Sequence, residues 1–465
     1  PIASSGSSLL NIAKTVKTIA LVNDNLRFKI NFASTGTLTH ANLDYITVNY
    51  TAKILPTNFH TDRNASCDDV ISINDGTVDD KMIVCDVTTP HAPVIMKGVL
   101  NGNDYRFSPI VNGHRRYAVK NTAWVSPTVT LVERINNQSI HSEPTPDMII
   151  ITPTQFKQQA QRIADLHLML DSMRVLVVEQ DKVFNEFSSG TPDFMAYRKM
   201  AKMFYDRGAD ESGHRLGYIL LFGRGTYDNR KLSSTVKALK YPMLLTWQTD
   251  NGSSEIDSYS TDDILGFLED GSGKSLHTET LSIAVGRMPV KSVTEAKNVV
   301  DKLYAYTTKQ DFGAWKNNVM VIADDMNNAV HMEQADAVIE GHKANGGESY
   351  VYNRIYLDAF ELENSGAGRA FPQARKKMYQ LLNEGVLYLN YIGHSGNYAW
   401  TADGLLTFND INSMYLKHYP LMLTASCEFT RLDKAEETGG ETLFLNPRGG
   451  AIALITTARQ VYITD

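Results

Sequence analysis

The sequence predicts an α/β protein whose mostly parallel sheet carries helices on both faces, preceded by an all-β module. From Asp147 onward, short apolar runs alternate with longer amphipathic segments, a pattern typical of parallel sheets. Before that point, β-branched and aromatic residues cluster in short runs separated by Gly, Asn, Asp and Pro. The change of pattern falls in the segment HSEPTPD, residues 141–147, which we interpret as a linker.

The first 145 residues are therefore expected to form an all-β N-terminal domain, 1–145. Its strand candidates combine β-branched and aromatic residues with polar turns. They are LRFKINFAS (26–34), DYITVNYTAKI (44–54), RRYAVKN (115–121) and TVTLVERI (128–135).

Two of the three cysteines fall in this domain. Cys67 and Cys85 lie 18 positions apart around the turn-rich stretch NDGT. In an oxidising compartment they could form a disulfide. The alternative is that all three thiols are reduced and buried, since free cysteine is among the most buried residue types. The sequence leaves both alternatives open.

The first α/β half, subdomain A at 146–310, is expected to alternate strands with amphipathic helices. The last helix opens with a capping box, Ser292 with Glu295. Strands are expected at 148–153, 173–180, 217–225 and 281–290, and helices at 154–170, 193–207 and 292–309.

The second half, subdomain B at 311–465, continues the series and is expected to be the catalytic part. Its apolar runs are short and bounded by polar or glycine-rich stretches, as buried strands of a parallel sheet require. Strands are expected at 317–325, 349–357, 386–394, 421–427 and 449–459, and helices at 331–342 and 371–385.

Composition excludes two classes of protein. The 465 residues are 43% hydrophobic and 21% charged, enough to bury the cores of two or three domains. The formal net charge is −7 and no long basic block is present, so we expect no nucleic-acid partner. No run of 18 apolar residues marks a membrane-spanning helix.

Two strand ends in the second half carry reactive side chains. In open α/β sheets, ligands bind beyond the carboxyl ends of the strands. The run VLYLNYIGHSG places His394 directly after an apolar strand and a glycine, and LMLTASC places Cys427 at the end of another. If these strands are neighbours, both side chains emerge at one edge of the sheet.

The chemistry of a thiol benefits from such a neighbour. A free cysteine has a pKa of about 8.5 and is mostly protonated at pH 7, whereas an adjacent imidazolium stabilises the thiolate. Cys427 would then be the nucleophile, and His394 would carry the proton to a leaving amine. The alternative is a packed core cysteine and an unrelated loop histidine; the placement of both residues at strand ends favours catalysis.

A metal site is less well supported. The segment DNGSSEIDSYSTDD offers Asp257, Asp262 and Asp263 as oxygen ligands for calcium, but it lacks EF-hand spacing. A solvated acidic loop is the alternative that we favour. We therefore expect that no cofactor is required, with calcium as the metal to test. The chain contains no GxSxG, HExxH or Walker A sequence.

Beyond these patterns, the chain resembles the gingipain family of cysteine peptidases, which belongs to the caspase-like clan. The similarity spans roughly residues 147–465. It rests on the strand ending in Gly-His, the strand ending in Ala-Ser-Cys, and the segments VFNEFSSGTPDFMAYRKMAKMFY, YILLFGRG and IAVGRMPVKSVTEAKNVVDKLYAY. The resemblance implies a caspase-like, gingipain-like sheet in two subdomains.

The resemblance also implies roles for single residues. Cys427 matches the family nucleophile and His394 its general acid and base, and backbone N–H groups of Cys427 and Ser395 would hold the oxyanion. Most of the family has Gly after the histidine, and Ser395 departs from this. A backbone donor survives any side chain. Asp325, at the end of the strand NNVMVIADD, is the candidate for orienting His394; a cap or surface turn is the alternative.

The implied function is processing at the cell surface. The β-rich domain and the sequence TASCEF resemble a sortase-like member of the family that belongs to the type IX secretion system. Such an enzyme removes the C-terminal signal domain of exported proteins and transfers the acyl product to anionic lipopolysaccharide. Outer-membrane components of that system would be its partners. The stretch MNNAVHMEQ after IADD matches no specificity acid of the arginine-cutting or lysine-cutting members, which favours such a narrow role.

Two further expectations complete this interpretation. Gingipain-like catalytic domains continue with helices and β modules after a strand such as GGAIALITTAR, so we expect the catalytic subdomain to be truncated at 465. The alternative function is a noncatalytic surface binding or assembly module that retains the peptidase fold. The presence of both Cys427 and His394 argues against it.

Overall fold

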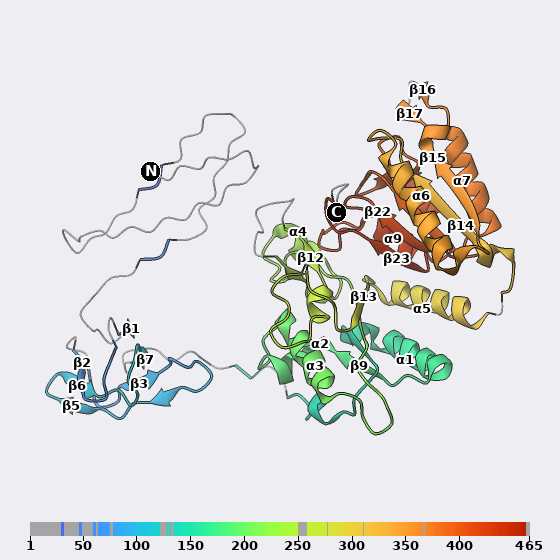
Figure 1. The fold of residues 1–465 in the computed structure, drawn as a ribbon. Coiled ribbons are helices and arrows are strands. Elements are labelled where there is room, and N and C mark those ends of the chain that lie inside the picture. The colour runs from blue at the N-terminus through green and yellow to red at the C-terminus, as the bar shows by residue number, and fades with distance from the viewer. Residues whose placement is uncertain are drawn as a thin grey trace. The chain divides into compact units, whose positions relative to one another are not determined.

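The chain is described by a computed structural model, shown in Figure 1. Its residues fall into two compact units, Val16–Asn136 and a larger unit that contains Asn137–Asp465. The described residues are 29–31, 46–48, 59–61, 64–74, 78–120, 128, 130–131, 134–249, 258–276, 278–309, 311–365 and 368–461.

The smaller unit is all β in its described part, as the sequence predicts. Its strands form two antiparallel sheets, in the orders β1-β7-β3-β4 and β2-β6-β5. Ile73, Val84 and Tyr117 are central in its core. The strand candidates 26–34 and 44–54 lie almost wholly outside the described residues. The strands are β1 (Phe59–His60), β2 (Ile71–Ile73), β3 (Ile83–Asp86), β4 (Val94–Ile95), β5 (Val99–Asn101), β6 (Asp104–Phe107) and β7 (Arg116–Lys120).

The cysteines of this unit correct the sequence analysis. Cys67, Cys85 and Cys427 are all free, so the disulfide alternative is wrong. The other alternative holds only in part, because Cys67 is exposed and the other two are half-buried rather than buried. Cys85 lies in β3, where it pairs with Ala118 and Ile95, whereas Cys67 lies in a turn.

The first half of the larger unit is a four-stranded parallel sheet in the order β13-β10-β8-β9. Alternate residues serve opposite faces. Ile149 and Leu221 pack in the core with α2 and α3, and Ile150 and Phe222 in the core with α1 and α5. The elements are β8 (Met148–Thr152), α1 (Lys157–Asp171), β9 (Val175–Glu179), α2 (Gln180–Phe187), α3 (Phe194–Arg207), β10 (Tyr218–Phe222), α4 (Ser234–Ala238), β11 (Trp247–Gln248), β12 (Ser260–Thr261), β13 (Ala284–Met288) and α5 (Val293–Thr308).

The second half is a five-stranded parallel sheet in the order β15-β14-β18-β22-β23. Met320 and Leu389 pack in the core shared with α7 and α8, whereas Val319 and Val321 face α6 (Figure 1). The elements are β14 (Asn318–Ala323), α6 (Val330–His342), β15 (Val351–Tyr356), β16 (Glu363–Ser365), β17 (Gly368–Ala370), α7 (Pro372–Glu384), β18 (Tyr388–Ile392), β19 (Ser395–Gly396), β20 (Ala399–Trp400), β21 (Leu406–Thr407), α8 (Phe408–Ser413), β22 (Leu421–Ala425), α9 (Gly439–Leu445) and β23 (Ala453–Thr456).

A mixed α/β fold with parallel sheets and helices on both faces is therefore confirmed. The capping box expected at Ser292 is half present. The Ser292 side chain accepts from the backbone N–H of Glu295 at 3.1 Å, but the Glu295 carboxylate accepts from Lys291 instead of Ser292.

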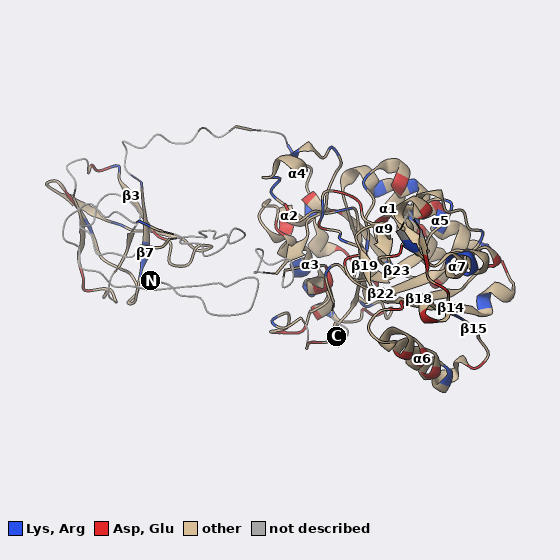
Figure 2. Cartoon of the chain, turned by 90° about the horizontal axis from the view of Figure 1, so that it is seen from above, with Lys and Arg blue, Asp and Glu red and all other residues tan. Residues whose placement is uncertain are grey.

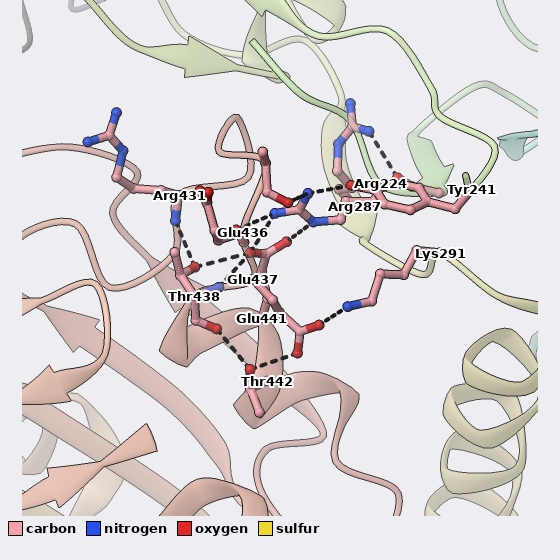
Figure 3. A network of polar contacts seen from close by, with 12 residues as sticks. Arg224, Tyr241, Arg287, Lys291, Arg431, Glu436, Glu437, Thr438, Glu441 and Thr442 are labelled. Carbon is pink, nitrogen blue, oxygen red and sulfur yellow. Dashed lines mark hydrogen bonds and ion pairs between the residues drawn. The ribbon is translucent and has the colours of Figure 1, made fainter. Parts of the chain in front are cut away.

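A buried ion pair joins the two halves of the larger unit (Figure 3). Arg224 follows β10 and Glu441 lies in α9; their side chains are 1% and 0% exposed. The guanidinium donates to both carboxylate oxygens, at 2.6 and 3.1 Å, and to the backbone oxygen of Glu436 at 2.8 Å. Glu441 also accepts from the backbone N–H of Thr438 at the start of α9. One carboxylate thus holds the start of α9 against the first sheet.

The surface of the described residues fits the composition. No described helix is long and apolar enough to cross a membrane. Figure 2 shows Lys and Arg together with Asp and Glu on helices such as α1 and α5. Mixed charge of this kind gives no strong single-sign field.

Candidate functional site

The strands that end in the two reactive residues are neighbours. β18 and β22 pair in parallel, and their last pair is Ile392 with Ala425. The backbone N–H of Gly393 donates to the oxygen of Ala425 at 3.2 Å, which keeps the two chains together beyond the strands. His394 and Cys427 each follow that last pair by two residues, so both emerge at the carboxyl edge of the sheet, as the sequence predicts.

Cys427 lies in a tightly bonded turn. Its backbone oxygen accepts from the hydroxyl of Ser395, and its sulfur lies 3.5 Å from the backbone oxygen of Val461. The next residue, Glu428, has a positive φ of 53°, which a non-glycine side chain adopts only under constraint. Within the described residues, neither Cys427 nor His394 donates a hydrogen bond to the other side chain. The thiol–imidazole contact stays a prediction.

The hairpin after His394 orients the backbone of Ser395. Ser395 pairs with Trp400, and the N–H of Thr401 donates to the oxygen of His394 at 2.9 Å. Because hydrogen-bonded and non-bonded pairs alternate in an antiparallel ladder, Ser395 and Trp400 form a non-bonded pair. The Ser395 N–H therefore points away from β20. This is the orientation that an oxyanion donor needs, and its role stays a proposal.

The residues that hold His394 differ from the expected one. The His394 ring lies 2.9 Å, Nε2 to Nδ2, from the side-chain amide of Asn327, and it meets the ring of His331 edge-on at 5.3 Å between centroids. Its backbone N–H donates to the carboxylate of Asp324 at 3.1 Å. Its backbone oxygen accepts from the hydroxyl of Tyr391 at 2.5 Å.

Asp325, the sequence candidate for orienting His394, has other partners. Its carboxylate lies 3.8 Å from the guanidinium of Arg369 in β17, and its backbone N–H donates to the carboxylate of Asp324. The other oxygen of Asp325 is buried, and no described residue is its hydrogen-bond partner. The doubled acid after β14 could have pointed to Asp324 equally well, whereas nothing in the spacing pointed to Asn327 or His331.

Burial disfavours the charged form of the Asp324 carboxylate. The residue is 1% exposed, and burial, together with the neighbouring Asp325, raises the pKa of Asp324 to about 6. The N–H of His394 stabilises the charged form and opposes this rise. A carboxylate that is forced to ionise in the folded state at pH 7 lowers the free energy of unfolding.

Asp324→Asn is therefore expected to stabilise the protein. A pKa raised in the folded state means that stability falls as the pH rises from about 4 to about 6, because the folded state holds the proton longer. Asn mimics the protonated form, so at pH 7 the gain should be roughly 1 to 2 kcal/mol and the fall between pH 4 and 6 should flatten. Urea unfolding at several pH values measures both.

Asp336→Asn in α6 is the matched control. Hydrogen bonds from Tyr356 and Arg354 lower the pKa of Asp336, so its replacement should not stabilise the protein at pH 7. An Asp324→Asn protein that is less stable than the original at pH 7 would contradict the burial argument.

Gly393 sets the position of His394, and Gly393→Ala should remove activity. Its φ of +156° is unfavourable for side chains, and an added Cβ would lie 2.4 Å from Cβ of Asp324. Because such a contact forces the chain apart, we expect a loss of at least about 2 kcal/mol of stability and at least a tenfold fall in peptide cleavage. Gly396→Ala, whose added Cβ meets nothing within 4 Å, is the control. Equal activity of the two variants would contradict this role.

The calcium candidates do not gather into a site in the described part of the chain. Both carboxylate oxygens of Asp262 accept from Arg287, at 2.7 and 2.8 Å, because β13 places that guanidinium beside it. Asp263 is the first residue of the short 3-10 helix Asp263–Leu265. Asp257 lies outside the described residues. Among the described residues, no group of three or more His, Cys, Asp or Glu side chains could hold a metal ion.

Comparisons with known proteins place this geometry in context. The profile of peptidase family C25 matches residues 141–465. The crystal structure of dimeric latent PorU from Porphyromonas gingivalis is 29% identical, over 56% of this chain and 27% of that one, with a TM-score of 0.46. The Arg-specific cysteine proteinase gingipain R is 15% identical, over 70% of this chain and 66% of that one, with a TM-score of 0.49.

A third structure, the complex of Porphyromonas gingivalis RgpB pro- and mature domains, is 14% identical, over 68% of this chain and 64% of that one, with a TM-score of 0.48. The chain therefore spans about a quarter of the PorU chain and less than two thirds of the two gingipain chains. Comparison with curated proteins finds no match.

Proposed function

Because the chain belongs to peptidase family C25, we propose that it is a cysteine endopeptidase in which Cys427 is the nucleophile and His394 the general acid and base. The observation that carries this proposal is the pairing of β18 with β22, which brings both residues to one edge of the sheet. Both residues lie within the matched range 141–465.

The proposed reaction has two halves. The Cys427 thiolate attacks the carbonyl carbon of the scissile peptide bond, and the oxyanion lies between the backbone N–H groups of Cys427 and Ser395. His394 then gives its proton to the leaving amine, the C–N bond breaks, and a thioester on Cys427 remains. Water or another amine attacks the thioester, gives up a proton to His394 and releases the thiolate.

For the substrate, we propose the C-terminal signal domain of proteins exported by the type IX secretion system. The segment TASCEF and the β-rich domain before residue 145 support this, by their resemblance to the sortase-like member of the family. In this proposal the acyl group passes to an amine on anionic lipopolysaccharide or to water. The site of action would be the cell surface at the outer membrane, with components of that secretion system as partners.

A noncatalytic binding or assembly module is the second candidate. One observation favours it: the Cys427 sulfur contacts the backbone oxygen of Val461, and no hydrogen bond links it to His394 in the described structure. A carbonyl oxygen at this distance can accept a hydrogen bond from a protonated thiol, but it cannot donate one to stabilise a thiolate. Titration of the three free thiols against pH separates the two candidates, because a catalytic Cys427 should react fastest.

The direct test uses a fusion of a carrier protein to a C-terminal signal domain. We expect the protein to release the domain and, with an amine-bearing acceptor present, to give a conjugate of carrier and acceptor. Release without conjugate would limit the function to hydrolysis. If no such fusion releases its domain but the protein cleaves other peptides from a library, the proposed substrate is wrong and the peptidase activity stands. If the protein cleaves no peptide at all, the result favours the binding module.

A further inference from the structure

One side-chain amide contacts two imidazoles at the candidate site. The Nδ2 atom of Asn327 lies 2.9 Å from Nε2 of His394 and 3.1 Å from Nε2 of His331. The two rings meet edge-on, with centroids 5.3 Å apart and an interplanar angle of 86°. His331 lies in the first turn of α6, and His394 follows β18, so the amide bridges a helix and a strand end.

The loop that carries this amide is held in an unusual conformation. Asn327, Asn328 and Ala329 all have positive φ, at 64°, 55° and 65°. Left-handed backbone is tolerated by asparagine and is unfavourable for alanine, and a run of three residues persists only when its surroundings hold it. The bonds from Asn327 to both rings are such a restraint.

The shared amide restricts which nitrogen of each imidazole can carry its proton. An amide nitrogen has two hydrogens and no acceptor, so if Nδ2 faces both rings, both Nε2 atoms accept and each neutral ring carries its proton on Nδ1. If the amide turns its oxygen inward, both Nε2 atoms must donate. Because one amide end serves both rings, their protons have to sit on the same kind of nitrogen at the same time.

We propose that Asn327 and His331 are positioning residues of His394, and that the amide they share couples the proton placement of the two imidazoles. This inference rests on the proposed role of His394 toward Cys427. With Nε2 engaged by the amide, Nδ1 is the nitrogen left for the thiol. With the amide oxygen inward, Nε2–H is held and the free Nδ1 takes the thiol proton, which gives thiolate and imidazolium.

The charges around the two rings bear on this equilibrium. His331 is 6% exposed, and burial and the neighbouring His394 lower the pKa of His331. Asp358, in the short 3-10 helix Leu357–Ala359, and the side chain of Gln334 oppose this fall. On the other side, the Asp324 carboxylate lies beside the backbone of His394. A neutral His331 and an ionised Asp324 at pH 7 leave a negative charge, and no positive one from His331, beside His394.

Two readouts test the coupling. In ¹⁵N-histidine NMR at pH 7.5, we expect the neutral rings of His331 and His394 to carry their protons on the same kind of nitrogen. In Asn327→Asp, whose carboxylate only accepts, the His394 proton should sit on Nε2. The second readout is the pH dependence of Cys427 alkylation by iodoacetamide, followed by mass spectrometry of its peptide. Asn327→Asp should move the inflection down by about one pH unit, since a charge-assisted bond holds the imidazolium.

His331→Phe should move the same inflection in the same direction by a smaller amount, because the amide can then turn without changing a second ring. His342→Phe, at the other end of α6 and bonded to Tyr352, is the control and should leave it unchanged. Neither readout requires a peptide substrate, so a failed peptidase assay and a failed coupling remain distinct. Protons on different nitrogens of the two rings, or an unmoved inflection in Asn327→Asp, would overturn the proposal.

Discussion

Cys427→Ala is expected to abolish peptide cleavage while leaving the fold intact. The sulfur lies at the rim of the second sheet, half-buried, 3.5 Å from the backbone oxygen of Val461. Removing it takes away the nucleophile but little packing, so kcat should fall by roughly 10⁴-fold or more and the unfolding midpoint should hardly change. The measurements are release of a C-terminal signal domain and urea unfolding.

His394→Ala should lose nearly as much activity, because residues that act as a unit do not contribute additively. Cys67→Ala is the matched control, since Cys67 is an exposed free cysteine of the β-rich unit and should not affect cleavage. A folded Cys427→Ala protein that cleaves at the normal rate would refute the assignment. Loss of both fold and activity would make Cys427 a structural residue.

Glu441→Gln is expected to destabilise the protein strongly. The carboxylate is fully buried and neutralises Arg224, which is 1% exposed (Figure 3). With glutamine, the guanidinium remains buried without a negative charge opposite it, and one of the two oxygens that accept from Arg224 and Thr438 becomes an NH2 group that cannot accept. We expect a loss of about 3 to 5 kcal/mol, measured as a lower urea midpoint at unchanged slope.

The double variant Arg224→Met with Glu441→Leu tests whether the loss of stability comes from leaving one buried charge unpaired. Because removing both charges leaves no unpaired ion, it should be clearly more stable than Glu441→Gln alone. Glu437→Gln is the surface control: Glu437 binds Lys291 in the same network, but both side chains are more than a fifth exposed, so its effect should be small. A Glu441→Gln protein as stable as the original would contradict the proposed joint between the sheets.

Much of this fold can be predicted from apolar runs. The strand at 386–394 and the strand at 421–427 are short, strongly apolar and bounded by turn residues, and they become β18 and β22 as neighbours. Parallel pairing buries both faces of such strands, so apolar residues dominate them, with Asn390 in β18 and Thr424 in β22 as buried polar exceptions. The reactive residues stand out because the first residues after a buried strand lie at its carboxyl edge, and His394 and Cys427 each follow the end of their strand by two residues.

The remainder of the site depends on contacts that a linear pattern does not encode. Asn327 reaches His394 only because the loop after β14 turns through three left-handed residues, and no residue type in that loop demands such a turn. Asp324 and Asp325 are adjacent and chemically alike, so only the path of the chain decides which one turns inward. In the sequence, Asp262 resembles a metal ligand. In the folded chain its carboxylate is paired with Arg287, which comes from a later strand, β13.

Detection of the acyl-enzyme shows directly whether Cys427 is the nucleophile. The protein is mixed with a signal-domain substrate, quenched in acid within the first turnover, and digested, and the mass of each cysteine-containing peptide is measured. We expect one adduct, a thioester of the substrate's acyl part on Cys427, formed at least 100-fold more slowly in His394→Ala. Cleavage with the adduct on Cys67 or Cys85 would contradict the role of Cys427 as nucleophile. Cleavage without any adduct, in a protein that also stays active after Cys427→Ala, would contradict it as well.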